Sequence, residues 1–401
     1  MKRLIRVISV ILLIVCSYVF TNIYYLTEST PNIIFSDKRT ITLTDEDIKC
    51  SVSNINGSSE NYELKLFNIF PVKNIKIKNN DIKKVVLCGN QFGIKIYSSG
   101  SIVTSISGVL TENGCKNPAY DSGIRKGDVI LSINDEPISC NSDIERIVKN
   151  SDEKLKIVYE RNDKKYTTTA YSVICAADNS KKLGMWIKDS IAGIGTATFY
   201  IKETGIAAGL GHGVYDNETN LLMPLSDGAV CGVGNHVVSR SSDGIIGDIS
   251  GNLSSENCGK IIKNSDNGVY FSGVEYDGKM VDIGHSSEIK IGNAQIYLSL
   301  NGEECKYYDC VIEKIKYNDK SKNLIIRITD KELLDKTGGI IQGMSGSPLL
   351  QNGKLIGAVT HVLVDDPTKG YAIFAENMLE TAQSVAESNK LKNASLSKPP
   401  A

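Results

Sequence analysis

The sequence has little net charge and few histidines. Its 45 basic and 46 acidic residues nearly cancel, which leaves a formal net charge of -1 over 401 residues. Because nucleic-acid binding depends on releasing counterions from a basic surface, this balance argues against a nucleic-acid partner. The four histidines are His212, His236, His285 and His361. Any reaction that needs an imidazole must use one of them.

Metal-ligand motifs are also missing. The ten cysteines include no Cys-x-x-Cys pair, and the close pair Cys305 and Cys310 has no histidine at metal-ligand spacing. The sequence therefore predicts no metal site and no cofactor.

What is abundant is glycine and β-forming residues. Thirty-five glycines, 18 tyrosines and many Ile/Val/Thr runs indicate a mainly β protein, and the length allows two or three domains. Between residues 183 and 387, about a dozen short apolar segments alternate with Gly or Asn/Asp turns, which predicts a β-barrel or paired barrels. Helical periodicity occurs there only in residues 375–387. The polar tail, residues 388–401, is expected to be disordered.

The N-terminus predicts a membrane anchor over residues 1–29. Lys2, Arg3 and Arg6 precede an apolar run at residues 7–26, which is long enough to cross a bilayer. The basic flank predicts a cytoplasmic N-terminus and an exported remainder. A cleaved signal peptide is the alternative, although no small-x-small site follows the run. Residues 30–84 then alternate β-like pieces with polar turns and predict a membrane-proximal β segment.

A glycine-rich loop carries the strongest catalytic signal. Gly343-Met344-Ser345-Gly346-Ser347-Pro348 surrounds a serine with glycines, which allow the tight turn that a nucleophile needs. The N–H groups of Gly343 and Ser345 are the candidate oxyanion hole. A structural Gly/Ser/Pro loop between two strands is the other interpretation.

This hexapeptide resembles the nucleophile loop of chymotrypsin-like serine peptidases. Its wider context, TGGIIQGMSGSPLLQNGKLIGAVTHV, resembles the stage IV sporulation protein B family of endospore-forming bacteria, and the resemblance covers most of the chain. It implies a double β-barrel peptidase domain at residues 183–387.

A second resemblance precedes that domain. The stretch GIRKGDVILSIN at residues 123–134 and the order of elements around it resemble PDZ domains of bacterial peptidases, which predicts a PDZ-like domain at residues 85–175. In such domains a loop captures a peptide carboxylate and the next strand pairs with the peptide. Phe92, Gly93 and Ile94 are the expected peptide-binding residues.

The base and the acid are assigned with the help of the family. His212, flanked by glycines in GLGHG, matches the family's base, and His361, 16 residues after Ser345, is the rival. The family match points to Asp330 as the acid that orients the imidazole. Asp248, 36 residues after His212, fits the wider chymotrypsin-like order better and remains the alternative.

The resemblance implies a membrane-anchored serine endopeptidase that signals in sporulation. It would be exported from the forespore into the space between the forespore and mother-cell membranes. There it would cleave itself and a regulator of a mother-cell intramembrane protease, so that a late sigma factor is processed. Its expected partners are these protein substrates, a peptide ligand of the PDZ-like domain, and the membrane. A catalytically inactive PDZ scaffold and an HtrA-like envelope quality-control protease are the alternatives.

Overall fold

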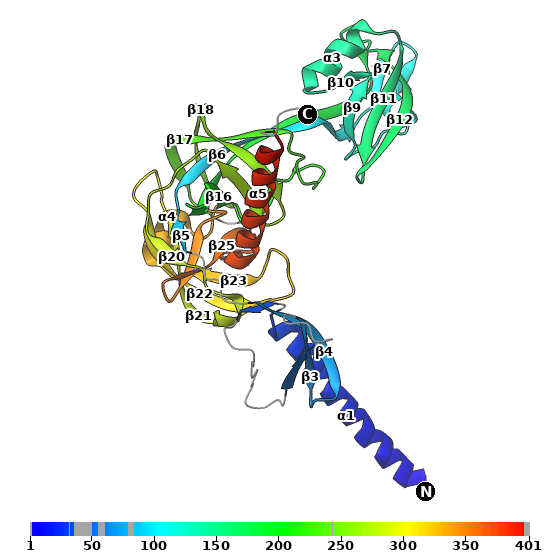
Figure 1. Ribbon diagram of the computed structural model, residues 1–401. Helices are drawn as coiled ribbons and strands as arrows, with labels where there is room; N and C mark the ends of the chain where they lie inside the picture. The colour runs from blue at the N-terminus through cyan, green and yellow to red at the C-terminus, as the bar shows by residue number, and fades with distance from the viewer. Residues whose placement is uncertain are drawn as a thin grey trace.

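The computed structural model describes residues 2–31, 33–35, 50–54, 61–78, 84–242 and 244–396 (Figure 1). A long N-terminal helix leads to a small sheet, two β-barrels follow, and a separate β-rich unit projects from the first barrel on the side away from that helix. The chain is mainly β, as the sequence predicted.

The N-terminal part consists of one helix and one sheet. Helix α1 (Lys2–Ser29) is long and apolar enough to cross a membrane, a test that a signal sequence also passes. A four-stranded sheet follows within the expected β segment, in the order β1-β4-β3-β2. Its strands are β1 (Ile33–Phe35), β2 (Cys50–Asn54), β3 (Asn61–Leu66) and β4 (Phe70–Lys78).

The first barrel is a ring of six strands in the order β6-β17-β18-β19-β16-β15, closed by pairing of β6 with β15. Strand β5 (Lys84–Leu87) extends the sheet from β15, and β20 (Met280–Asp282) pairs with β5. Aromatic and branched side chains such as Phe92, Phe271 and Ile96 fill the interior. The ring strands are β6 (Gln91–Ile106), β15 (Met185–Ile201), β16 (Ile206–Gly209), β17 (Asp227–Ser239), β18 (Asp248–Ser265) and β19 (Gly268–Ser272).

The second barrel is closed in the order β21-β22-β23-β26-β25-β24. The 3-10 helix η1 (Ser286–Glu288) precedes it, and α4 (Lys331–Thr337) follows β23. Two closed six-stranded barrels are the double-barrel architecture that the sequence predicted. The strands are β21 (Gly292–Leu298), β22 (Lys306–Ile315), β23 (Leu324–Ile328), β24 (Pro348–Gln351), β25 (Lys354–Leu363) and β26 (Asp366–Phe374).

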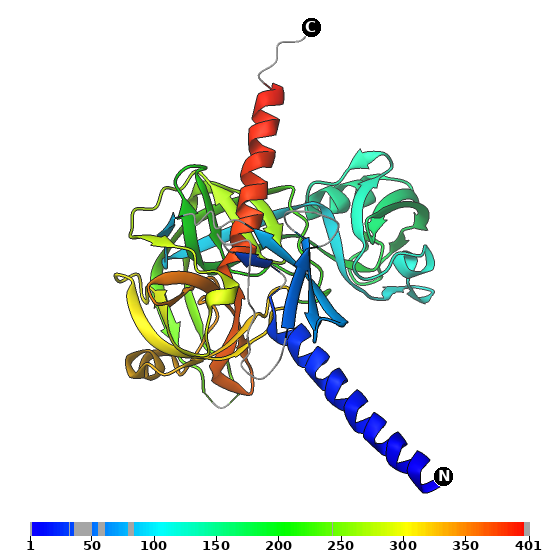
Figure 2. The ribbon, with the colours of Figure 1, turned by 60° about the horizontal axis from the view of Figure 1, so that its bottom comes forward.

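Helix α5 (Ala375–Leu396) packs over the junction of the barrels (Figure 2). Its buried Met378 and Ala382 belong to one core cluster with Phe199 of the first barrel and Ala358 of the second. The helix continues to Leu396, so the expectation of disorder from residue 388 is wrong for residues 388–396. Residues 397–401 lie outside the described residues.

The PDZ-like unit is inserted within the first barrel, because β6 and β15 each run through both. The beginning of each predicted domain, 85–175 and 183–387, therefore needs correction. Residues 91–97, assigned to the PDZ-like domain, pair with β15 and β17 as barrel strands. Residues 185–188, assigned to the peptidase domain, pair with the PDZ-like end of β6. The inserted elements are β7 (Val109–Thr111), β8 (Gly114–Lys116), α2 (Pro118–Asp121), β9 (Val129–Ile133), β10 (Glu136–Pro137), α3 (Asn141–Asn150), β11 (Lys154–Arg161), β12 (Lys164–Tyr171), β13 (Val173–Ile174) and β14 (Lys181–Lys182).

Candidate active site

Two consecutive β-turns present Ser345. The N–H of Met344 donates to the carbonyl of Ile341 (3.2 Å), and the N–H of Ser347 donates to the carbonyl of Met344 (2.9 Å). The third residue of each turn is a glycine with positive φ, +93° at Gly343 and +97° at Gly346. A type II turn requires such a residue at that place. Ser345 is the second residue of the second turn and stays half-buried, as a reactive hydroxyl requires.

Strand β15 of the first barrel holds this loop in place by hydrogen bonds to its carbonyl groups. The N–H of Thr196 donates to the carbonyl of Ser345 (2.8 Å), and the Thr196 hydroxyl donates to the carbonyl of Gly343 (2.7 Å). The Thr198 hydroxyl donates to the carbonyl of Gly346 (2.7 Å). Both threonines are fully buried. Their role cannot be recognised from the sequence, because a threonine in a strand normally indicates only β-propensity.

Close packing explains the second glycine of the loop. A Cβ on Gly346 would lie 1.9 Å from the carbonyl oxygen of Thr196, so a side chain there would force the loop away from β15. The loop carbonyls thus face the first barrel. In the described part of the chain, the N–H groups of Gly343 and Ser345 have no hydrogen-bond acceptor. Donors left free in this way are what an oxyanion hole needs.

A strained turn presents His212. The N–H of Gly211 donates to the carbonyl of Gly209 (2.9 Å), and the central Leu210 has φ +65°. A leucine at the centre of such a γ-turn costs free energy, and strain of this kind often marks functional sites. The N–H of Leu210 also donates to the carbonyl of Thr196 (3.2 Å), so one threonine contacts both loops.

The His212 imidazole is held in one tautomer. Its Nδ1 lies 2.7 Å from the carbonyl oxygen of Gly213. Because a carbonyl can only accept, Nδ1 carries the proton and Nε2 keeps the lone pair that a general base needs. Burial lowers the pKa of His212, against the opposing effect of the Gly213 carbonyl. The ring is therefore neutral at neutral pH.

Both loops meet at one segment of β25. The Ser345 hydroxyl donates to the carbonyl of Thr360 (2.7 Å), and the ring of His212 packs on that of His361 with centroids 4.7 Å apart. No hydrogen bond joins Ser345 to His212 in this structure, although both residues are described. The Ser345 hydroxyl would therefore have to rotate away from the carbonyl of Thr360 to form a hydrogen bond with the imidazole.

His361 lies beside His212. Burial, followed by the neighbouring His212, lowers the pKa of His361 to about 4. Its Nδ1 is buried and has no hydrogen-bond partner among the described residues. The structure therefore brings together Ser345, His212 and the rival histidine, with the two imidazole rings tilted by 34° to each other.

Asp330 is not brought to the imidazole. It is the N-cap of α4, and its carboxylate accepts the N–H groups of Leu333 (3.0 Å) and Asp309 (3.3 Å). Ile325 of β23 lies opposite His361 of β25, with β26 between them. Asp330 follows Ile325 by five residues and is therefore two strands away from His361. The expected contact of Asp330 with the base is thus wrong for this structure.

Asp248 has a different location, at the start of β18. It forms a parallel bridge with Gln342, directly before the nucleophile loop. No contact joins its carboxylate to His212 within the described chain. The carbonyl of Gly213 therefore occupies the position at Nδ1 that an acid was expected to fill.

The predicted peptide-binding residues are core residues of the first barrel. Gly93 pairs with Ile194 on one side and with Cys231 on the other, so neither edge of this strand is open to a peptide. Phe92 and Ile94 are 4% and 2% exposed. The assignment of Phe92, Gly93 and Ile94 to peptide binding is wrong, because both hydrogen-bonding edges are already used.

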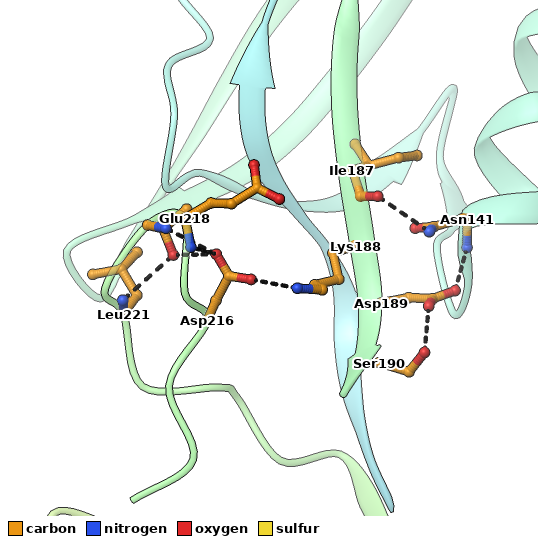
Figure 3. A network of polar contacts seen from close by, with 9 residues as sticks. Asn141, Ile187, Lys188, Asp189, Ser190, Asp216, Glu218 and Leu221 are labelled. Carbon is orange, nitrogen blue, oxygen red and sulfur yellow. Dashed lines mark hydrogen bonds and ion pairs between the residues drawn. The ribbon is translucent and has the colours of Figure 1, made fainter. Parts of the chain in front are cut away.

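An open strand edge exists elsewhere in the PDZ-like unit. The first residues of β15 pair with β6 on one side, and on the other no described strand pairs with them. Helix α3 lies there instead: Asn141 donates its N–H to Asp189 (2.7 Å) and its side-chain amide to the carbonyl of Ile187 (3.3 Å) (Figure 3). Lys181 donates to the carbonyl of Ser151 at the other end of α3. The chain enters this strand through Leu183-Gly184-Met185, beyond the expected boundary of the PDZ-like domain.

A double β-barrel in which a glycine-flanked serine and a histidine meet between the barrels defines the class of chymotrypsin-like serine peptidases. The model of the SpoIVB peptidase S55 family matches residues 179–379, just over half of the chain. The chain belongs to this family and is a serine endopeptidase.

Solved structures give weaker similarities. The Rv3671c protease from M. tuberculosis in its active form is 14% identical, with a TM-score of 0.30, over 49% of this chain and 74% of that chain. The HtrA-type protease AlgW with tripeptide is 15% identical, with a TM-score of 0.31, over 49% of this chain and 57% of its own. The PDZ domain of an SdrC-like protein from Listeria monocytogenes is 17% identical, with a TM-score of 0.19, over 23% of this chain and 90% of that domain. At these TM-scores the similarities carry no argument about mechanism or partners. No curated protein matches the chain.

Proposed function

We propose that Ser345 is the nucleophile and His212 the general base of this endopeptidase. The observation that carries the assignment is that the Ser345 loop and the strained His212 turn meet at Thr360 and His361 of one strand. After rotation, the Ser345 hydroxyl gives its proton to Nε2 of His212 and attacks the scissile carbonyl. The N–H groups of Gly343 and Ser345 stabilise the oxyanion, and water releases the acyl-enzyme.

The carbonyl of Gly213 supplies the orienting hydrogen bond in this proposal. It fixes the His212 tautomer without a negative charge, so it stabilises the imidazolium less than a carboxylate does. Asp330 enters the scheme only if α4 rearranges on substrate binding, because its carboxylate caps that helix.

The biological role follows from the family. We infer that the peptidase is held in the membrane by α1 and exported into the space between forespore and mother cell. It cleaves itself and a regulator of a mother-cell intramembrane protease, which permits processing of a late sigma factor. Support comes from membership of the SpoIVB family and from the apolar N-terminal helix.

The PDZ-like unit directs the peptidase to its protein substrates in this proposal. An extended peptide would pair with the open edge of β15 next to α3, with its carboxylate at the loop of Leu183 and Gly184. An HtrA-like quality-control protease is the second candidate. The insertion of the PDZ-like unit within the first barrel favours the signalling role, because a shared strand couples peptide binding to the site more directly than a linker does.

The test uses the purified full chain in lipid vesicles. A serine-reactive phosphonate should label Ser345 in the wild type, and Ser345→Ala should lose self-cleavage and peptide hydrolysis by about 10⁴-fold or more. Ser299→Ala is the matched control, because Ser299 is buried at the end of β21, outside the loop. Labelling at another residue, or near wild-type activity of Ser345→Ala, would refute the assignment.

A further inference from the structure

The hairpin of β3 and β4 ends in an exposed apolar tip. Its residues Phe67, Asn68, Ile69 and Phe70 are all exposed, with Ile69 at 70%. Exposure of three large apolar side chains to water at one turn of a small sheet costs free energy. The feature belongs neither to the peptidase site nor to the edge of β15 beside α3.

The backbone of the tip is strained. The N–H of Ile69 donates to the carbonyl of Leu66 (3.1 Å), and Phe67 and Asn68 have φ +54° and +62°. These angles define a type I′ turn, whose central positions favour Asn and Gly. A phenylalanine in the first of them costs free energy and directs an aromatic ring to the end of the hairpin.

The hairpin lies along α1. Strand β4 packs on the helix, and both views show the hairpin beside its C-terminal half (Figures 1 and 2). The helix residues Val19, Asn22, Ile23 and Leu26 are partly or fully covered, whereas Tyr24 is 71% exposed. Covered residues at spacings of three and four form one stripe, so this face of α1 is packed as far down as Val19.

The end of α1 fixes the height of the tip. Lys73 of β4 donates to the carbonyls of Thr27 (3.2 Å) and Thr30 (2.7 Å), and the side chain of Asn318 in the second barrel also donates to Thr27 (3.0 Å). Phe70 precedes Lys73 by three residues, about 10 Å along a strand. Seven residues of helix, from Leu26 back to Val19, cover about the same rise.

That height is the edge of the bilayer. Helix α1 has 28 residues, so it is about 42 Å long against a hydrocarbon core of about 30 Å. Counted from Arg6, the outer edge of the core falls between Asn22 and Leu26, where Tyr24 and Tyr25 are exposed as in an aromatic belt. The hairpin tip, at the level of Val19, thus lies three to seven residues of helix below this edge, about 5–10 Å into the outermost part of the acyl layer.

We propose that residues 67–70 form a second membrane-contact site, which enters the outer interfacial layer beside α1. The occupant is the lipid bilayer, because the tip continues the surface of a membrane-spanning helix and ends at its interface. The backbone groups of the turn that pair with no described residue keep the tip from entering more deeply. The membrane is then contacted both by α1 and by residues 67–70. Together with the hydrogen bonds of Lys73 and Asn318, these two contacts set the height and tilt of the barrels above the membrane.

The experiment measures the depth of a tryptophan placed at the tip. The chain has one tryptophan, the exposed Trp186, so Trp186→Phe gives a silent background. In it, Ile69→Trp is compared with Leu110→Trp, which is 62% exposed in the PDZ-like unit. Phe70→Trp is a second tip probe in case Ile69→Trp does not fold. The full chain is reconstituted in phosphatidylcholine and phosphatidylglycerol vesicles with brominated lipids.

We expect the tip emission to shift to shorter wavelength and to be quenched most by lipids brominated near the headgroup. Emission of Leu110→Trp should stay at the wavelength of a hydrated indole without quenching. Tip emission equal to that of the control would overturn the proposal. A shift to shorter wavelength without lipid quenching would also overturn it, because it would show that protein covers the tip.

Discussion

The Nζ of Lys188 lies 2.9 Å from Oδ2 of Asp216 and joins the PDZ-like strand to the loop that follows His212 (Figure 3). Lys188 is where β15 passes from the inserted unit to the first barrel. Asp216 is fully buried and follows His212 by four residues. Its other oxygen accepts the N–H groups of Glu218 and Thr219. Burial alone would raise the pKa of Asp216, but Lys188 and Thr219 outweigh it and lower the pKa.

This pair should couple stability and activity. We expect Lys188→Met and Asp216→Asn to show a coupling free energy of about 0.5–2 kcal/mol in a double-mutant cycle of urea unfolding. Lys188→Met should also lower peptide hydrolysis, because it leaves a buried carboxylate unpaired next to the His212 loop.

The control is the exposed pair of Lys182 and Asp178, at 2.6 Å. Lys182→Met changes the same residue type in the same unit, but solvent screens the charges, so no measurable coupling is expected. Equal effects of both lysine variants would contradict a special role for Lys188.

The two neighbouring histidines should contribute unequally to kcat/KM. His212→Ala is expected to lower kcat/KM by about 10³-fold to 10⁴-fold, because the proton acceptor is lost. His361→Gln is expected to cost less than about tenfold, or 1.4 kcal/mol, since this ring packs on the base without contacting Ser345. The measurement is kcat/KM on one peptide. The reverse order would show that His361 is the base.

Thr196 and Thr198 offer a matched pair in the support of the nucleophile loop. Thr196→Val removes the hydroxyl bonded to the carbonyl of Gly343, and Thr198→Val removes the equivalent bond to Gly346. Each leaves a buried carbonyl unpaired and should cost about 1–3 kcal/mol of stability. Only Thr196→Val should lower kcat at constant KM, because it loosens the Gly343 peptide of the proposed oxyanion hole. Equal kcat values in the two variants would argue against that role.

Acid should destabilise the native state through His361. Its pKa is lowered from 6.5 to about 4. Between these values the unfolded chain binds the proton and the native state does not, so the free energy of unfolding falls as the pH falls from about 6.5 to 4. In His361→Leu this part of the slope should disappear. Urea midpoints measured across that range would contradict the prediction if wild type and variant gave the same slope.

The sequence by itself determined those features that depend only on residues close together in the chain. Glycines around Ser345 predicted a tight turn, and the turns there form because Gly343 and Gly346 adopt positive φ at no steric cost. Short β segments punctuated by glycine predicted barrels, because alternation and turn chemistry are local signals. The apolar run of α1 could likewise be recognised from its own composition.

Only the tertiary structure decided which distant segments meet. Gly93 resembled part of a peptide-binding strand, but pairing with Ile194 and Cys231 places it in a barrel wall. Asp330 was separated from Ser345 by 15 residues, yet its carboxylate caps α4, since an N-cap bond forms with the nearest free N–H groups. Thr196 holds the loop of Ser345 across about 150 residues of sequence. Such contacts depend on strand register and barrel closure, which no local pattern specifies.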